Sequence, residues 1–374
     1  MKVICNRGAL LDALAVVGQA VATRTPKAVL QCVKLSAEGD KLTLTGTDLE
    51  LAVRYTDHQV QVEAPGDVLL PADKLRDIVR ESVDDTLSLE AGGSGAGEQA
   101  VIKGADSEFK IFTQNPSEFP DVAEVDGEPD YQIAAGALKG LIGQTLFAAA
   151  KEGTRFAFNG VLVLVKDGNL TFVATDGRRL AKAQTPVSNV AEKDAKDKPA
   201  DPIVPTKALQ IVDKLVSDPE EMISVHLLGN RIAFATADAL VTSNLVEGTF
   251  PPYDKVIPDD SDRHMTAATS DFTSAVRRAA LLTNEETRGV RMKFEEGNLV
   301  LSSRNPDSGE ATVNFACKYD GEPVEIGFNP QFLVDALKVV DTDEIQLGLS
   351  APNRPGLIKS GDDFLYVIMP VNLS

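Results

Sequence analysis

Histidine is the side chain most often used for proton transfer near neutral pH, and this sequence has three of them. They are His58, His226 and His264, one in each third of the chain, and their spacing matches no metal-ligand motif. An isolated histidine is more often a structural or surface residue than a catalytic one. We therefore interpret all three as structural or surface residues.

A glycine-rich stretch over residues 92–97 reads GGSGAG and could be mistaken for a phosphate-binding loop. A phosphate-binding loop of that type needs a Lys-Ser or Lys-Thr pair and a helix immediately after the glycines. Here Glu98 and Gln99 follow, and then a predicted strand. The stretch therefore predicts a flexible hairpin loop.

Carboxylates stand at two predicted turns, Thr47-Asp48 and Thr175-Asp176-Gly177, where a hydrolase could keep a general base. The same dipeptide recurs at equivalent points of two parts of the chain, as a turn required by the fold would do. The sequence has no Gly-x-Ser-x-Gly, His-Glu-x-x-His or Cys-His arrangement. A metabolic enzyme that uses Asp176 stays an alternative, and Asp176→Asn would then abolish turnover without altering assembly.

Basic residues lie on the polar faces of the predicted helices. The same asymmetry occurs in each third of the chain, as expected if the helices line one concave surface that faces phosphates without reading base sequence. Ordinary solvated helix faces are the alternative for any single lysine. The residues are Lys74, Arg76, Arg80, Lys139, Lys151, Arg155, Lys207, Lys214, Arg277, Arg278 and Lys338.

These features belong to a unit of about a third of the chain that occurs three times. Each unit begins with a strand and an amphipathic helix, near residues 2–6, 131–133 and 264–265. Several strands joined by turns follow, then a second helix, then more strands. The second helices begin near Pro71, Thr206 and Asn329, and we expect the last two residues to be N-caps.

Short alternating strands joined by tight turns favour antiparallel sheets with helices against one face. The sequence therefore predicts an α+β protein of three repeated domains, with the helices on an inner face and the sheets outside. We place the domains at residues 1–127, 128–258 and 259–374.

Composition predicts a folded cytoplasmic protein, with 43% hydrophobic and 25% charged residues. No signal sequence or 18-residue apolar run occurs, so we expect no membrane segment. Cys5, Cys32 and Cys317 are few and far apart, which favours reduced thiols. The net charge of −19 opposes a polyanionic partner on average, but a protein that closes around DNA needs only a local basic surface.

Along essentially its whole length the sequence resembles the bacterial DNA polymerase III β subunits, the sliding clamps. The segments that carry the resemblance are LTLTGTDLE (42–50), RFAFNG (155–160), VATDGRRLA (173–181), LVEGTFPPY (245–253), NEETRGVR (284–291) and YVIMPVNL (366–373). The resemblance implies a non-catalytic processivity factor without a cofactor: a head-to-tail homodimeric ring around double-stranded DNA. It also implies loading by a clamp loader, and tethering of the DNA polymerase III α subunit and other polymerases or repair proteins by short peptides.

The resemblance also implies site residues. For the peptide pocket they are Phe158, Thr175, Gly177, Arg178, Arg179, Leu180, Pro251, Lys255, Val256, Asn329, Phe332, Asn353, Pro355, Val367, Met369, Pro370, Val371 and Leu373. For DNA they are Arg24, Lys151, Arg155, Phe156 and Lys207, and for the subunit interface Phe109 and Ile111 against Leu281 and Leu282.

The sequence departs from the family pattern at several positions. Arg178 stands where His is frequent and Asn372 where a basic residue is common, and Ser374 extends the usual end. These bear on peptide preference, whereas Asp73, where a basic residue is frequent, bears on DNA contact. A specialised clamp paralogue, such as one that confers resistance to a clamp inhibitor, stays an alternative to the housekeeping protein.

Overall fold

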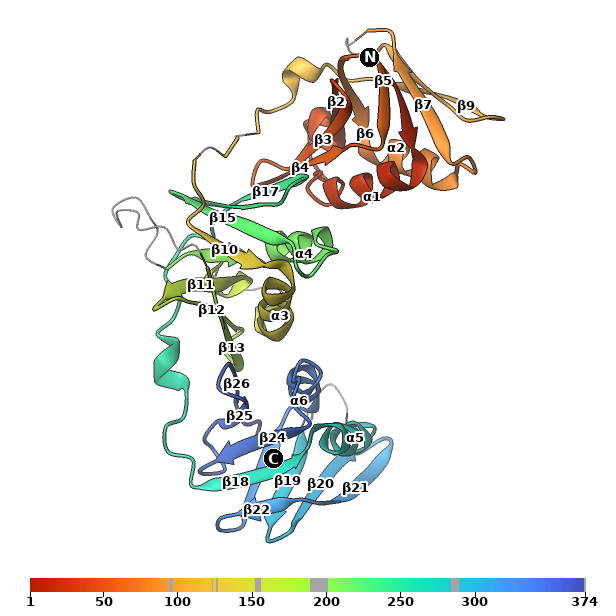
Figure 1. Ribbon diagram of the computed structural model, residues 1–374. Helices are drawn as coiled ribbons and strands as arrows, with labels where there is room; N and C mark the ends of the chain where they lie inside the picture. Colours follow the sequence, from red (N-terminus) through yellow and green to blue (C-terminus); the bar gives the residue numbers. More distant parts are fainter. Residues whose placement is uncertain are drawn as a thin grey trace. The chain divides into compact units, whose positions relative to one another are not determined.

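The computed structural model describes residues 1–93, 97–122, 124–125, 127–151, 156–188, 201–283 and 289–372 (Figure 1). One order of elements occurs three times: strand, helix, several strands, helix, three strands. This order is the one that the sequence predicted. The glycine-rich stretch lies between two strands that pair as a hairpin, as expected, although residues 94–96 lie outside the described part.

The first repeat contains β1 (Lys2–Asn6), α1 (Arg7–Val17), β2 (Cys32–Glu38), β3 (Lys41–Thr47), β4 (Leu51–Asp57), β5 (Val60–Ala64), β6 (Gly66–Pro71), α2 (Ala72–Glu81), β7 (Thr86–Ala91), β8 (Gln99–Lys103) and β9 (Glu108–Phe112). The second contains β10 (Tyr131–Ala134), α3 (Ala135–Thr145), β11 (Gly160–Lys166), β12 (Asn169–Thr175), β13 (Arg179–Pro186), β14 (Ile203–Pro205), α4 (Thr206–Leu215), β15 (Met222–Leu228), β16 (Arg231–Ala235) and β17 (Ala239–Asn244). The third contains β18 (Arg263–Ala268), α5 (Thr269–Ala280), β19 (Val290–Glu295), β20 (Asn298–Asn305), β21 (Gly309–Ala316), β22 (Lys318–Asp320), β23 (Val324–Phe328), α6 (Pro330–Leu337), β24 (Glu344–Leu349), β25 (Gly356–Ser360) and β26 (Phe364–Ile368).

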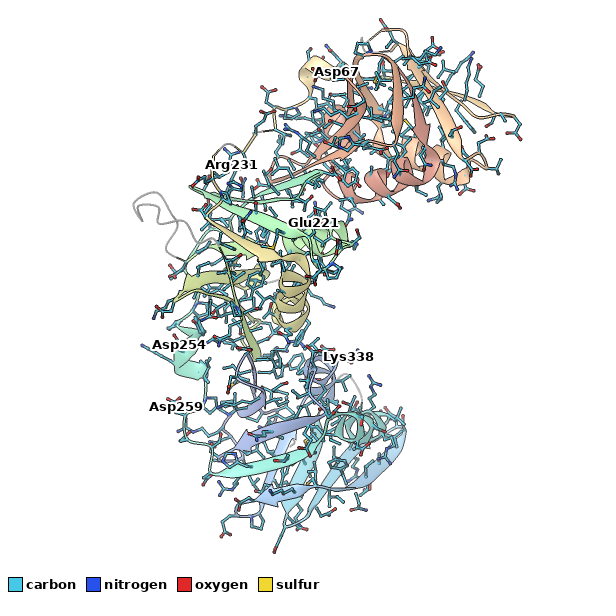
Figure 2. The ribbon with its side chains drawn as sticks, in the orientation of Figure 1. Asp67, Glu221, Arg231, Asp254, Asp259 and Lys338 are labelled. Carbon is cyan, nitrogen blue, oxygen red and sulfur yellow. The ribbon has the colours of Figure 1, made fainter. Side chains whose placement is uncertain are left out.

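Local chemistry explains where the helices begin. Asn329 caps α6 by accepting the backbone N–H of Gln331, with Pro330 at the first helical position, as predicted. Thr206 was expected to cap α4, but α4 begins at Thr206 itself, directly after Pro205. The prediction of Thr206 as the N-cap was wrong because Pro205 takes the position before the first helical residue, as Pro71 does in α2. Lys338 follows the end of α6, where a cation is favoured by the helix dipole (Figure 2).

Among the described residues, two of the four sheets take strands from two repeats. One has the order β10-β15-β16-β17-β4-β3-β2-β6, and another has β14-β11-β12-β13-β26-β25-β24-β18-β22. The remaining sheets are β5-β1-β7-β8-β9 and β21-β20-β19-β23. The antiparallel pair β17–β4 thus joins the second repeat to the first, and β13–β26 joins it to the third.

This sheet order divides the chain into two compact units. The first holds the whole first repeat with β10, nearly all of α4, and β15 to β17. The second holds most of α3, β11 to β14 and the whole third repeat. The second repeat is therefore shared between the units.

Aliphatic side chains dominate the interior of each repeat. On α1 the buried residues recur at helical spacing, with Leu10, Leu14 and Val17 nearly inaccessible to solvent. Cys5 and Cys32 are buried free thiols and Cys317 is half-buried, so none of the three forms a disulfide. Among the described helices, none is both long and apolar enough to cross a membrane.

Candidate functional site

The first acidic turn joins β3 to β4 and is held by its own side chains. The Thr47 hydroxyl donates to the carbonyl of Leu51 at 2.9 Å and accepts the N–H of Leu49 at 3.0 Å. The Asp48 carboxylate accepts the N–H groups of Glu50 at 3.1 Å and Leu51 at 2.8 Å through Oδ1. Leu49 has φ 80°, a left-handed conformation that is rare for leucine.

The second acidic turn, between β12 and β13, repeats this pattern residue for residue. Thr175 donates to the carbonyl of Arg179 at 2.6 Å and accepts the N–H of Gly177 at 3.1 Å. Asp176 Oδ1 accepts the N–H groups of Arg178 at 2.9 Å and Arg179 at 3.1 Å, and Gly177 has φ 84°. Both Thr-Asp pairs therefore build the same turn, as the prediction of a structural turn expected.

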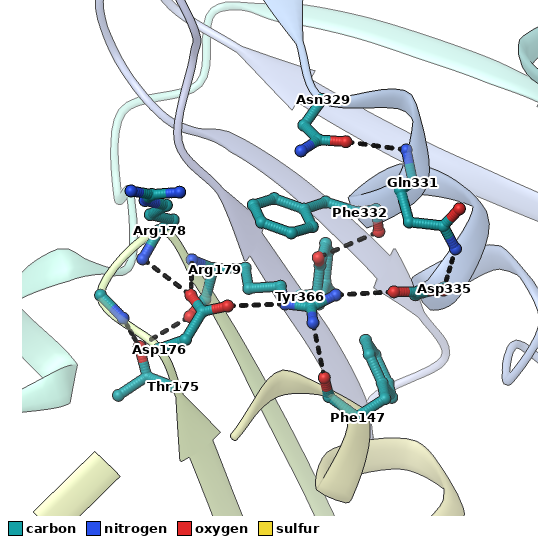
Figure 3. A network of polar contacts seen from close by, with 11 residues as sticks. Phe147, Thr175, Asp176, Arg178, Arg179, Asn329, Gln331, Phe332, Asp335 and Tyr366 are labelled. Carbon is teal, nitrogen blue, oxygen red and sulfur yellow. Dashed lines mark hydrogen bonds and ion pairs between the residues drawn. The ribbon is translucent and has the colours of Figure 1, made fainter. Parts of the chain in front are cut away.

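The buried guanidinium of Arg179, only 9% exposed, organises the residues behind the second turn (Figure 3). Its Nε donates to Asp176 at 3.0 Å and its Nη1 to Asp335 of α6 at 2.8 Å. Its Nη2 donates to the carbonyl of Phe147 at 2.7 Å, and the guanidinium carbon lies 4.3 Å from the centre of the Phe332 ring. One cation therefore holds β13 of the second repeat against α6 of the third.

The charges around Arg179 keep it ionised. Burial alone would lower the pKa of Arg179, but the hydrogen bond to Asp335 and the charge of Asp176 more than offset this and raise it. Burial raises the pKa of neighbouring Tyr366, whose hydroxyl donates to the carbonyl of Phe332 at 3.0 Å. The centre is thus a charged, hydrogen-bonded network around a neutral phenol.

Several predicted peptide-pocket residues meet where β13 pairs with β26. Leu180 lies opposite Val367, and both belong to one buried apolar cluster that includes Phe250. The N–H of Met369 donates to the carbonyl of Arg178 at 2.9 Å. Met369 is nevertheless 41% exposed, so an apolar side chain remains available at this junction.

Other predicted pocket residues surround this junction. Phe158 lies beside Gly177, where an added Cβ would come 3.5 Å from its ring. Lys255 and Val256 belong to the short 3-10 helix Tyr253–Val256, and Val256 is 49% exposed. Asn353 and Pro355 lie in the loop between β24 and β25, Pro251 and Pro370 lie in connecting segments, and Val371 donates its N–H to the carbonyl of Gly327 at 2.8 Å. Leu373 lies outside the described residues.

Two predicted pocket residues, Asn329 and Phe332, also line a hollow of about 1130 Å³ between α5 and α6. This hollow includes Leu281, which the resemblance assigned to the subunit interface and which is 78% exposed. The other predicted interface residues are Leu282, which is half-buried, Phe109, which is 38% exposed, and Ile111, which is buried on the same face of β9.

Two of the predicted DNA residues, Arg24 and Lys207, line one hollow of about 780 Å³ in the first unit. Arg24 is exposed, but Lys207 Nζ lies 2.6 Å from Asp48 Oδ2 and is already paired. Lys151 is exposed. Arg155 and the side chain of Phe156 lie outside the described part of the chain.

The basic helix residues are not uniformly free cations. In α2, Arg76 lies 3.2 Å from Asp73 and Arg80 lies 3.2 Å from Asp77, so local acids offset both. Arg277, Arg278 and Lys338 are instead exposed around a hollow of about 590 Å³ between α5 and α6. The predicted basic residues do lie on α2, but acids on the same helix are close enough to pair with Arg76 and Arg80, which reduces the positive charge of this helix.

The site residues named from the sequence did not include Asp335 and Phe147, whose oxygens accept hydrogen bonds from Arg179. Neither lies in a segment that carries the resemblance, and a carbonyl acceptor such as that of Phe147 leaves no trace in the sequence. No group of His, Cys, Asp and Glu side chains within the described ranges is arranged to hold a metal ion.

Comparison with known proteins decides the family. Models of the N-terminal, central and C-terminal domains of the DNA polymerase III β subunit match residues 1–123, 132–252 and 254–372. The chain belongs to the DNA polymerase III β subunit family. This confirms the resemblance noted in the sequence and the three-domain clamp fold.

Individual members of this family agree over their full lengths. The chain is 34% identical to the beta sliding clamp of Pseudomonas putida, with 100% of both proteins covered, and 30% identical to that of Chlamydia muridarum, with 100% of this chain and 99% of the other covered. A crystal structure of the Pseudomonas aeruginosa sliding clamp bound to griselimycin is 33% identical and has a TM-score of 0.91 over 100% of both chains. A Bacillus subtilis sliding clamp also gives a TM-score of 0.91, at 26% identity.

Proposed function

We propose that this protein is a sliding clamp: two copies close into a ring around double-stranded DNA and tether the proteins that work on it. The observation that carries this proposal is the match of all three repeats, along the whole chain, to DNA polymerase III β subunits. As a ring it works by enclosure and binding rather than by catalysis. We place its domains at residues 1–127, 128–258 and 259–374, and the protein in the cytoplasm.

The order of strands supports closure by two copies. By their places in the repeats, β9, β17 and β26 are counterparts, and so are β4, β13 and β21. β17 pairs with β4 and β26 pairs with β13, whereas β9 and β21 each end a sheet within the described part of the chain. Pairing β9 of one copy with β21 of the other completes the series, and the two-fold arrangement uses both such edges.

Side chains around these edges suit an interface. Phe109 and Ile111 share one face of β9, and Leu281 and Leu282 follow α5 in the third repeat. A leucine that is 78% exposed is the kind of apolar anchor that an interface covers. We assign these four residues to the subunit interface.

The partner peptides would bind where β13 meets β26. Exposed Val256 and Met369 supply apolar surface, and the turn at Gly177 with Phe332 of α6 supplies rigid walls. Such a slot suits an extended peptide whose apolar side chains carry most of the affinity. The peptides would come from the clamp loader, the DNA polymerase III α subunit, and other polymerases or repair proteins. We assign the full predicted peptide set, including Leu373, to this pocket.

Contact with DNA would be independent of base sequence, because the assigned residues Arg24, Lys151, Arg155, Phe156 and Lys207 supply mainly cations for phosphates. The net charge of −19 for the whole chain disfavours binding of DNA to the outside of the ring.

A topological trap tests the proposal without a loader. The protein is incubated with linear duplex that carries biotin at both ends, and streptavidin is added either after or before the protein. We expect retention on the DNA through a high-salt gel-filtration column only when the ends are blocked after the protein has threaded on. Equal loss, or equal retention, in the two orders of addition would refute encirclement.

A further inference from the structure

Lys207 is one of the cations that the proposed function assigns to DNA, and it already forms an ion pair with Asp48. Lys207 Nζ lies 2.6 Å from Asp48 Oδ2, at the hollow that Arg24 also lines. Lys207 is the first residue after Thr206 on α4, whereas Asp48 lies in the turn between β3 and β4.

The matching turn of the second repeat shows why Asp48 needs this partner. There the outer oxygen of the aspartate, Asp176 Oδ2, accepts from Arg179, a residue of the same turn. In the first turn the position of Arg179 is occupied by Leu51, which carries no charge. The outer oxygen of Asp48 therefore takes a cation from another repeat.

The two side chains of this ion pair differ in how freely they can move. Asp48 is fixed, because its Oδ1 accepts two backbone N–H groups of the turn, and its side chain is only 20% exposed. The side chain of Lys207 is 48% exposed and ends a flexible stem. Exposed ion pairs are weak, so a phosphate can displace the carboxylate by moving the lysine alone.

We propose that Asp48 limits the grip of the clamp on DNA by holding Lys207 in an ion pair that a phosphate must displace. A ring that moves along DNA benefits from contacts that are individually weak, and the carboxylate removes most of the contribution of one cation in each protomer. The proposal rests on the function proposed above and on Lys207 being one of its DNA contacts.

Salt dependence of DNA binding measures the number of phosphates engaged, at about 0.9 in the slope of log K against log salt for each phosphate. Asp48→Asn keeps the Oδ1 acceptor of the turn and removes the charge that holds Lys207. We expect this variant to steepen the slope by about 0.9 per protomer. Over a fourfold rise in salt this corresponds to an additional loss of affinity of about 3.5-fold per protomer.

The experiment is a fluorescence anisotropy titration of a short labelled duplex at several NaCl concentrations, with the wild type, Asp48→Asn, Lys207→Gln and the double variant. Asp40→Asn is the matched control, because Asp40 is exposed in the β2–β3 turn and its loss removes the same charge. Circular dichroism and the urea midpoint of each variant verify that the fold is intact.

A steeper slope in Asp48→Asn that disappears in the Lys207→Gln background is the expected result. The inference is overturned if Asp48→Asn matches the wild type, if Asp40→Asn has the same effect, or if the effect persists without Lys207. Binding by the wild type that does not depend on salt would instead overturn the proposed DNA contacts, and the inference with them.

Discussion

Removal of the Asp335 carboxylate should destabilise the junction between the second and third repeats. Asp335 accepts from Arg179 at 2.8 Å and from Gln331 at 2.6 Å, and Arg179 is 9% exposed. Asp335→Ala leaves the buried guanidinium with Asp176 and the carbonyl of Phe147 as its remaining partners.

The magnitude follows from the burial of both partners. Breaking a fully buried ion pair by removing one side costs about 3–5 kcal/mol. Asp335 is 21% exposed and Asp176 remains to pair with Arg179, so we expect Asp335→Ala to cost about 2 kcal/mol. Asp335→Asn retains an oxygen that can accept from the guanidinium and should cost about 1 kcal/mol.

Urea unfolding followed by circular dichroism measures this cost, with Asp341→Ala as control because Asp341 is exposed beyond the end of α6. A cost below about 0.5 kcal/mol, typical of a surface substitution, would refute the view that Arg179 needs both carboxylates.

Three further outcomes are expected. Gly177→Ala should cost about 1 kcal/mol of stability in urea unfolding, because φ is 84°, a conformation that disfavours alanine. The nearby Phe158 ring leaves room for the methyl group and should add no further cost. No change in stability would show that the turn relaxes. Leu281→Asp should shift the protein from dimer to monomer in sedimentation velocity, whereas Val83→Asp, at a residue that is 80% exposed, should not; equal behaviour of the two would argue against the assigned interface. Burial raises the pKa of Cys32 from 9.0 to about 11. The stability that the neutral Cys32 thiol contributes should therefore be complete below pH 9 and decrease as the pH rises toward 11. A Cys32→Ala variant with the same alkaline decline as the wild type in thermal melts would contradict this.

Local patterns predicted the parts of this molecule that local hydrogen bonds determine. The Thr-Asp pairs were expected to be turns required by the fold, and both make the same side-chain hydrogen bonds. Asn329 was expected to cap a helix and does so. These predictions succeeded because the donor, the acceptor and the turn lie within five residues of one another.

Contacts between repeats were beyond the reach of such patterns. Asp335 resembles any exposed helix residue in the sequence, and its partner Arg179 lies 156 positions away. Lys207 was expected to be a cation available to DNA, but Asp48, 159 positions earlier, already pairs with it. In both cases the pairing depends on which strands join the repeats, and neither composition nor spacing specifies that order.

The sharing of the second repeat between two sheets has a consequence for synthesis on the ribosome. β4 pairs with β3 early, but its second neighbour, β17, emerges only roughly 180 residues later, which takes on the order of ten to forty seconds. During that time the nascent first repeat carries an open backbone edge that can pair with another chain. Fragments that end before residue 239 should therefore aggregate. If a chaperone or a separately supplied second repeat prevents this aggregation, the cause is the open strand edge and not a low stability of the first repeat itself.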